Sequence, residues 1–565
     1  MLRASLRILV VAALLPAAQS QAPSKDASSK DVPSPIPVIV AHSSLVLIPA
    51  VVTDHGNHVA GLTKDDFGVW EDHHPQKIAV FEEITTEPGQ IRRTNPKDAG
   101  FTNAVTPESK NQRLTLIVLD TLNTRFEDQV RARRELLKFV EESLRPSEPV
   151  ALMTIGANGL NVINDFTADP EVLAAAVKKV RGQPSAAERS EADRADLDQA
   201  IQFQQRTGRG PTTQNGIADN LEGFSSGLFD QFEQMHQQQA AEVTLRALRQ
   251  IGEAFSGVPG RKTLIWATGG APFVANDPSS FSFRNQNLLP LYESAWNALN
   301  ESQVSVYPLD MGGLFNPGFV SPRYGRPVRY RRFVDSVSNL EEFAKMTGGR
   351  LCEFKLNLSG CYLDTQKDAS HYYLIGYYAD VTQGKTGWRK LDVLVSGRKV
   401  EVRARTSYYV RPKPPDPKKS ELEDMDSAIL SPTDFSAVPI LVRWTGSAPE
   451  GDKVKLSFRF NVPAVGVTVD RESKNLMSLA FGAFAKTSKG GIAGDFVKEL
   501  EGNLSAEMAE QIASRGVVYE GAIAVPPGQY TVRFVVRDNL TARVGTVSVP
   551  VDTAAAFTIV TTPAK

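Results

Sequence analysis

Three short segments of the chain are almost entirely apolar, and each ends at a polar residue. They are Leu114–Asp120, Thr263–Thr268 and Val304–Asp310. Continuous apolar runs of this length are typical of strands buried on both faces, as in a parallel sheet covered by helices on each side. Segments with helical spacing separate the three runs. The pattern therefore predicts an α/β fold with an open, mostly parallel, doubly wound sheet.

The neighbouring segments complete the predicted α/β unit, which spans residues 110–371. Shorter apolar stretches predict further strands, and apolar residues three and four positions apart predict helices. The expected strands are 151–156 and 160–166, and the expected helices are 126–144, 170–180, 240–255, 289–300 and 340–346. Residues 181–239 are rich in Gln, Arg, Asp and Gly, and predict a polar insertion that is partly helical and partly mobile.

Strand-like patterns stand on both sides of this unit, at residues 38–84 and 372–410. Neither stretch is long enough for a comfortable independent β domain. We therefore expect the two to pair into one discontinuous β-sandwich, with the α/β unit inserted in it. Residues 85–112 are polar and predict a linker, and the Pro-rich start of 411–437 predicts a second, stiff linker.

Residues 438–555 contain a further set of strands and predict a C-terminal β-sandwich. The chain is long enough for these separate cores, because it has 565 residues, 41% of them hydrophobic. Lys and Arg number 63 and Asp and Glu number 64, so the net charge is −1. This balance argues against a partner that is nucleic acid, which a broadly basic surface would bind.

Residues 1–20 are typical of a secretory signal peptide. Two arginines precede a short apolar stretch at 8–18, and Ala18 and Ser20 place small residues before the expected cleavage point. Residues 21–37 predict a disordered leader. No later stretch approaches the ~20 apolar residues that cross a bilayer. We therefore expect an exported, periplasmic or extracellular protein without a transmembrane span in its mature chain.

Two cysteines, Cys352 and Cys361, lie nine positions apart. Two cysteines are too few for a disulfide-rich scaffold or a cysteine zinc cluster. In an exported chain, this pair is expected to form one disulfide bond.

The order of several segments resembles that of von Willebrand factor A (VWA) domain proteins, of the acidobacterial VWA-related type. The segments are Val51–Gly56, Gly61–Phe67, Leu114–Thr124, Lys262–Gly270, Val304–Asp310 and Tyr372–Tyr377. The resemblance covers residues 40–410 and extends more weakly to the C-terminal strands. It implies a Mg²⁺ or Mn²⁺ ion in a metal-ion-dependent adhesion site at the carboxyl edge of the sheet, where oxygen ligands from several loops converge.

In the family, this site is built from an Asp-x-Ser-x-Ser segment after the first strand, a distant Thr, and an Asp after the central strand. By this resemblance Asp120 is the first Asp and Thr124 the last hydroxyl. Asn123 and Thr268 are the other candidate ligands.

The ligand set departs from the family pattern at two positions. Leu122 stands where the middle Ser is expected, and Gly269 stands where the second Asp is expected. The distant Thr cannot be placed, because the insertion falls in that region. The incomplete set favours an alternative interpretation, in which Asp120 and Thr124 cap the following helix and close the sheet edge without a metal.

Other short motifs point to chemistry only weakly. Gly223–Gly227 matches the Gly-x-Ser-x-Gly pattern of a hydrolase nucleophile, but it lies in the polar insertion rather than between a strand and a helix. Gly384–Thr386 lacks the upstream glycine of a phosphate loop. Asp72–His74 is predicted as a hairpin turn rather than a metal site, and Gln231–Gln239 as a solvated helix face.

The favoured function is therefore an exported, non-enzymatic scaffold that binds a protein partner through the carboxyl edge of the sheet. Two alternatives stay open: a hydrolase that uses the insertion, and a purely structural envelope component. No paired carboxylates, histidine dyad or cofactor loop supports an enzyme. The expected contact residues are Asp120, Thr121, Asn123, Thr124, Thr268, Gly269 and Asp310.

Overall fold

The structure is a computed structural model, and its described residues are 43–88, 91–92, 100–104, 106–107, 112–145, 148–207, 217–273, 288–311, 328–352, 357–380, 387–410 and 417–553. The expected signal peptide at 1–20, the leader at 21–37 and the strand residues 38–42 lie outside the described residues. In the part that is described, no helix combines the length and the apolar character needed to span a membrane.

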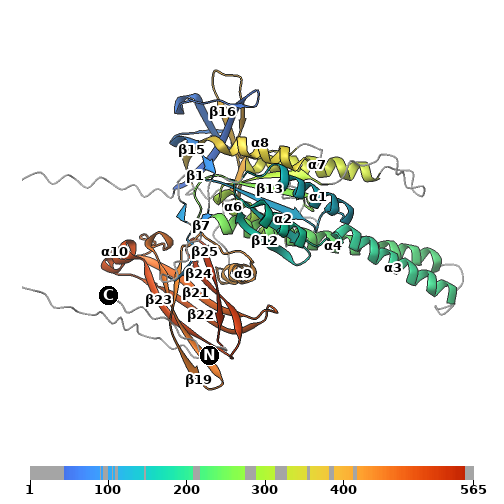
Figure 1. Ribbon diagram of the computed structural model, residues 1–565. Helices are drawn as coiled ribbons and strands as arrows, with labels where there is room; N and C mark the ends of the chain where they lie inside the picture. The colour runs from blue at the N-terminus through green and yellow to red at the C-terminus, as the bar shows by residue number, and fades with distance from the viewer. Residues whose placement is uncertain are drawn as a thin grey trace, which may run out of the picture. The chain divides into compact units, whose positions relative to one another are not determined.

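Strands from both sides of the central unit share two antiparallel sheets (Figure 1). One has the order β17-β1-β15-β5, with β2 beside β1, and the other has the order β18-β16-β3-β4. Alternate residues of the two sheets, such as Ile48, Val69, Ile375 and Leu391, form one core. The elements are β1 (Ser43–Asp54), β2 (Asn57–His58), the short 3-10 helix η1 (Lys64–Asp66), β3 (Phe67–Glu71), β4 (His74–Gln76), β5 (Ile78–Thr85), β15 (His371–Asp380), β16 (Gly387–Val395), β17 (Glu401–Arg403) and β18 (Ser407–Val410).

The three apolar runs lie in a mixed sheet with the order β12-β11-β10-β13-β14. Strands β10, β11, β13 and β14 pair in parallel, whereas β12 is antiparallel to β11. The strands are β6 (Glu87–Pro88), which pairs with the start of β10, β10 (Gln112–Asp120), β11 (Val150–Gly156), β12 (Gly159–Thr167), β13 (Lys262–Thr268) and β14 (Val304–Asp310). The helices are α1 (Phe126–Glu142), α2 (Pro170–Lys179), α3 (Ala186–Thr207), α4 (Ile217–Phe255), α6 (Leu289–Glu301), α7 (Val328–Thr347) and α8 (Leu358–Ser370).

The predicted fold class, an α/β fold with an open, mostly parallel, doubly wound sheet, is wrong. Several of the sheets that the structure describes are antiparallel, and the sheet with the apolar runs is mixed. One cause is local: two residues separate β11 from β12, and so short a connection can only join antiparallel strands. The larger cause is that most strands belong to the flanking antiparallel sheets.

Each face of the mixed sheet has its own core. Leu116 and Val118 of β10 pack with residues of α4, α6 and α7. The alternate residues Ile117 and Leu119 pack with residues of α1, α2 and α8. Burial on both faces explains why the run 114–119 is continuously apolar.

Two antiparallel sheets form the C-terminal β part, with the orders β23-β20-β19-β8 and β22-β21-β24-β25. Their facing residues form one core, in which the rings of Phe458 and Phe534 lie 5.0 Å apart. The elements are β8 (Phe101–Thr102), β19 (Leu441–Glu450), β20 (Lys453–Val462), η2 (Ala464–Gly466), β21 (Leu476–Lys486), β22 (Ile492–Asn503), α10 (Ala506–Arg515), β23 (Val517–Val525), β24 (Gln529–Asp538) and β25 (Arg543–Asp552). A separate two-stranded ladder joins β7 (Ile91–Arg92) and β9 (Thr106–Pro107).

Two stretches expected to be linkers take part in this C-terminal β part. Within 85–112, β8 pairs with β19, and the buried Asn103 side chain donates to the carbonyls of Phe435 and Val438. Within 411–437, helix α9 (Pro417–Leu430) places Met425, Ala428 and Ile429 in a core with β24 and β25. These three residues are separated by three positions and by one, so they lie on one side of a helix. Packing of that side on the sheet explains why this segment is helical rather than extended.

Candidate functional site

The strand ends of the mixed sheet bring several predicted site residues together. Asp120, Thr268 and Asp310 end β10, β13 and β14, and Thr268 lies opposite Asp310 in the β13–β14 register. Each lies an even number of positions from residues of its own strand, such as Val118 and Trp266, that belong to the core with α4, α6 and α7. Because side chains alternate along a strand, all three lie on that face of the sheet.

Asp120 is at the centre of this group and is only 2% exposed. Its Oδ1 accepts the backbone N–H of Asn123 at 3.0 Å. Its Oδ2 accepts from Asn123 Nδ2 at 2.8 Å, Thr268 Oγ1 at 2.9 Å and Trp266 Nε1 at 3.2 Å. Asn123 Nδ2 also donates to Thr244 of α4 at 2.8 Å. The carboxylate is therefore surrounded by donors of the chain itself.

Burial raises the pKa of Asp120 to about 6, and the hydrogen bonds from Asn123, Thr268 and Trp266 act in the opposite direction. Those donors stabilise the charged form, because they replace water that the buried carboxylate has lost. Asp120 thus serves as an acceptor that joins β10, β13 and the following loop.

A divalent cation does not fit this arrangement. Trp266 Nε1 can only donate, and it points at an oxygen that would have to bind the ion. A Cβ atom at Gly269 would lie 2.7 Å from the carbonyl oxygen of Asn123, so a second carboxylate has no room there. Leu122 is buried in the core. Over the described ranges, no cluster of three or more His, Cys, Asp or Glu side chains is arranged to hold a metal.

The other predicted contact residues are also occupied within the fold. Thr121 Oγ1 donates to the carbonyl of Ile155 at 2.9 Å, and Thr124 Oγ1 accepts the Gly269 N–H at 2.8 Å. Both threonines are buried, as are Thr268 and Asp310. The structure thus gathers the predicted residues at one edge, but mainly as partners of one another or of the backbone.

The alternative interpretation assigned the cap of the helix after β10 to Asp120 and Thr124. In the structure, the start of α1 is capped by a different residue. The N-cap residue, Arg125, makes no side-chain cap. Instead, the Glu188 carboxylate of α3 accepts the Phe126 N–H at 3.1 and 3.2 Å. Burial opposes ionisation of Glu188, yet hydrogen bonds from Ser185 and Phe126 leave its pKa below the usual value. The insertion therefore supplies the acidic group that the positive end of α1 favours.

A hollow of about 450 Å³, counting the part open to solvent, lies beside this edge. Its lining combines the ends of β10 and β13 with the first turns of α1 and the chain after α2. The predicted residues Asp120, Thr121 and Thr124 contribute to it, together with apolar residues that the sequence assigned to no site, such as Phe126 and Val130. The apolar spacing of residues 126–144 predicted only that they form a helix.

The weaker motifs lie in structures that differ from catalytic ones. Gly223–Gly227 is inside helix α4, whereas a nucleophile elbow needs a turn between strand and helix. Gln231–Gln239 also belongs to α4, where His236 pairs with Asp193 of α3 at 2.6 Å. Asp72–His74 includes the turn between β3 and β4. The Gly384–Thr386 motif lies outside the described residues.

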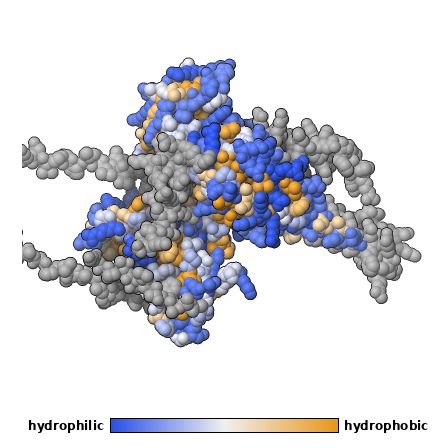
Figure 2. Space-filling view, in the orientation of Figure 1, coloured by the Kyte–Doolittle hydropathy of each residue, from blue (hydrophilic) through white to orange (hydrophobic). Residues whose placement is uncertain are grey.

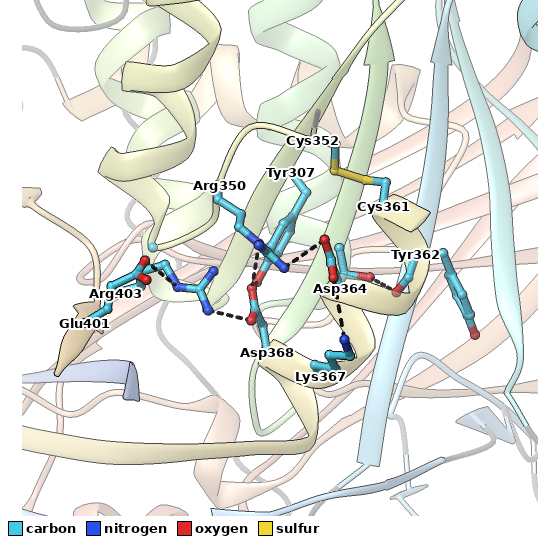
Figure 3. Close-up of polar contacts among 12 residues, drawn as sticks. Tyr307, Arg350, Cys352, Cys361, Tyr362, Asp364, Lys367, Asp368, Glu401 and Arg403 are labelled. Atoms are coloured by element: carbon cyan, nitrogen blue, oxygen red, sulfur yellow. Dashed lines mark hydrogen bonds and ion pairs between the residues drawn. A yellow bond between two sulfur atoms is a disulfide. The ribbon is translucent and has the colours of Figure 1, made fainter. Parts of the chain in front are cut away.

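The predicted disulfide between Cys352 and Cys361 is confirmed. It holds the first turn of α8, and a later turn of the same helix carries Asp368 (Figure 3). Asp368 accepts from Arg403 of β17 at 2.7 Å and pairs with Arg350 at 3.4 Å. Because all of these groups belong to or contact α8, the disulfide supports the polar connection between this helix and the sheet that contains β1 and β17.

Comparisons with known proteins assign no family to this arrangement. No protein-family model matches the chain, and no curated protein shows significant similarity to it.

Proposed function

We propose that the chain is an exported, non-enzymatic scaffold that binds a protein partner, and that this binding requires no metal ion. One observation carries the proposal: the polar groups at the carboxyl edge of the mixed sheet satisfy one another, while the hollow beside them is open to solvent and has more apolar than polar surface. Such a hollow suits recognition by burial of apolar surface rather than acid–base chemistry.

The edge itself offers poor catalytic groups. Asp120 is buried, and four donors of the chain already form hydrogen bonds to its two carboxylate oxygens. The same donors argue against a bound cation, which would have to displace them. The resemblance of residues 40–410 to VWA domain proteins supports protein binding as the class of function, without the metal that the family uses.

Export is supported by two features of different kinds. The pattern of residues 1–20 is that of a signal peptide. The Cys352–Cys361 disulfide is of a kind that persists in oxidising compartments. Together they favour a periplasmic or extracellular protein.

A capture experiment tests this function. The mature, affinity-tagged chain is incubated with the exported fraction of the producing cells in Mg²⁺, in Mn²⁺ or in excess EDTA, and retained proteins are compared with a tag-only control. We expect the same retained protein under all three conditions. Retention only with a cation would refute metal independence, and retention of nothing beyond the control would refute the binding function.

A further inference from the structure

The hollow beside the sheet edge has a floor and a wall of apolar side chains. The floor comes from the carboxyl ends of three strands, and the wall comes from α1 and the residue after α2. These residues are Leu119, Ala267 and Met311 for the floor and Val130, Ala132 and Val180 for the wall. Their chemistry favours an apolar group as the occupant.

Two apolar residues at the hollow are in contact with water. Phe126 is 46% exposed and Val130 is 37% exposed, although both belong to a helix that packs on the sheet. Figure 2 shows hydrophobic residues scattered among hydrophilic ones on the viewed face, and single exposed apolar residues of that kind are ordinary. Here the two adjoin one concave site, which is the arrangement typical of an anchor pocket in a protein interface.

The hollow is held open by groups packed around it. Gln129 Nε2 donates to the carbonyls of Thr121 and Thr124 at 2.9 and 2.7 Å, and Gln129 Oε1 accepts the Gln183 N–H at 3.0 Å. A Cβ atom at Gly182 would lie 2.7 Å from the Phe126 ring, so the chain after α2 packs tightly on that ring. These contacts order the site before any partner arrives, which lowers the entropy cost of binding.

The surroundings of the hollow are basic. Arg133 is part of the lining and donates to the carbonyl of Val180 at 3.0 Å. Lys178, Lys179 and Arg181 flank Val180 in the chain, are exposed, and make no ion pair with any residue that the structure describes.

Most of the nearby acidic residues are engaged within the chain, whereas Glu127, next to Phe126, is exposed and forms no ion pair with a residue that the structure describes. Glu191 pairs with Arg125 at 3.0 Å, and Asp128 pairs with Arg131. Glu188 caps α1. The uncompensated charge beside the hollow is therefore mainly positive, and it complements an acidic partner.

We infer that the hollow binds one large apolar side chain of an extended protein segment, and that acidic residues on either side of that side chain contact the basic residues beside Val180. This inference rests on the proposed protein-binding function and names the chemistry of the partner. An apolar anchor supplies most of the affinity of such a contact, and the charges supply orientation and association rate.

Dye-labelled peptides provide the test. The mature chain is titrated with Asp-Asp-Leu-Asp-Asp, with Asp-Asp-Ser-Asp-Asp and with Lys-Lys-Leu-Lys-Lys, and binding is followed by fluorescence polarisation. We expect the acidic leucine peptide to bind at least about tenfold more tightly than the other two, and to weaken as salt is added. Equal binding of the leucine and serine peptides would overturn the inference.

Two matched variants locate the binding. Val130→Glu places a charge at the hollow, whereas Val172→Glu makes the same change on α2 at a valine that is 43% exposed and outside the lining. Circular dichroism and thermal midpoints check that both variants fold. We expect about a tenfold loss of peptide affinity for Val130→Glu and no change for Val172→Glu. Equal affinities of Val130→Glu and the wild type would overturn the inference.

The capture experiment separates the two proposals. If Val130→Glu retains the natural partner as well as the wild type does, the hollow is not the binding site, and the scaffold function stands. If the wild type retains no partner, the scaffold function fails whatever the peptides do.

Discussion

Lys262 is a buried lysine with no carboxylate partner among the described residues, and its removal should stabilise the protein. The residue begins β13, is 1% exposed, and donates from Nζ to the carbonyl of Val258 at 2.5 Å. Burial lowers the pKa of Lys262 from 10.5 to about 7. The folded chain therefore holds this lysine largely neutral at a pH where the unfolded chain holds it charged.

The sign of the pH effect follows from proton binding. Between the folded pKa of about 7 and the unfolded value of 10.5, the unfolded chain binds more protons at Lys262. Raising the pH through this window therefore favours the folded state. At about 1.4 kcal/mol per pH unit, this one group adds up to about 4 kcal/mol to the free energy of unfolding between pH 7 and pH 10.

Lys262→Met removes this contribution and keeps an apolar stem of similar length. We expect the free energy of unfolding of the variant to exceed that of the wild type by about 3 kcal/mol at pH 7. This figure allows about 1 kcal/mol for the lost hydrogen bond to Val258. By pH 10 the difference should vanish or change sign. The assay is urea unfolding from pH 7 to pH 10, followed by the fluorescence of Trp266 and Trp296, which lie in the same core.

The control is Lys138→Met, which changes an exposed lysine on α1. It should show no difference from the wild type that varies with pH. A Lys262→Met variant whose stability ran parallel to that of the wild type across this range would refute the reasoning, because it would mean that the buried lysine titrates as it does in the unfolded chain.

Three further changes test other contacts. Replacing Cys352 and Cys361 by Ser should lower the free energy of unfolding by roughly 2–3 kcal/mol, since the disulfide closes a short loop; calorimetry against the oxidised wild type measures this, and an unchanged melting temperature would contradict it. Gly269→Ala should cost about 1–3 kcal/mol in urea unfolding, because its Cβ has no room, and a neutral result would show that the loop shifts freely. Glu188→Gln should cost about 1 kcal/mol at pH 7 through the weaker cap on Phe126. Because the folded pKa of Glu188 is lowered, this cost should fade as the pH falls below the usual glutamate value of 4.5 and through the folded pKa, and a cost that persisted at acid pH would contradict it.

Burial on both faces is the property that could be predicted best from the sequence. The runs ending at Asp120, Thr268 and Asp310 are strands with those ends, and helix α1 begins at Phe126 as expected. A strand covered on both sides must be apolar throughout, so composition alone reveals it. The disulfide between nearby cysteines followed from compartment chemistry in the same direct way.

Pairing between distant segments could not be predicted in this way. Asn103 reads as part of a polar linker, yet its side chain bonds with the backbone of Phe435 and Val438 and so completes the C-terminal β part. The fold class failed for a related reason, because the direction of β12 and the number of antiparallel strands depend on which strands become neighbours. Helix α9 was missed because its apolar spacing is short and a Pro-rich run precedes it.

For the site, the meeting of strand ends was predictable, but the identity of the donors was not. Trp266 reads as one more apolar residue of a buried run, and nothing in its position along the chain indicates that its indole N–H reaches Asp120. Phe126 and Val130 have the spacing of core residues, and their exposure depends on how α1 sits over the ends of β10 and β13.

The residues at the sheet edge are consistent in their chemistry. Leu122 is a buried core residue, and Gly269 makes a close backbone contact that leaves no room for a side chain. The buried Asp120 carboxylate accepts hydrogen bonds from Asn123 and Trp266 in place of water. Binding a metal here would require breaking these hydrogen bonds as well as adding ligands. A partner would therefore gain more by burying apolar surface in the neighbouring hollow than by offering a ligand to this edge.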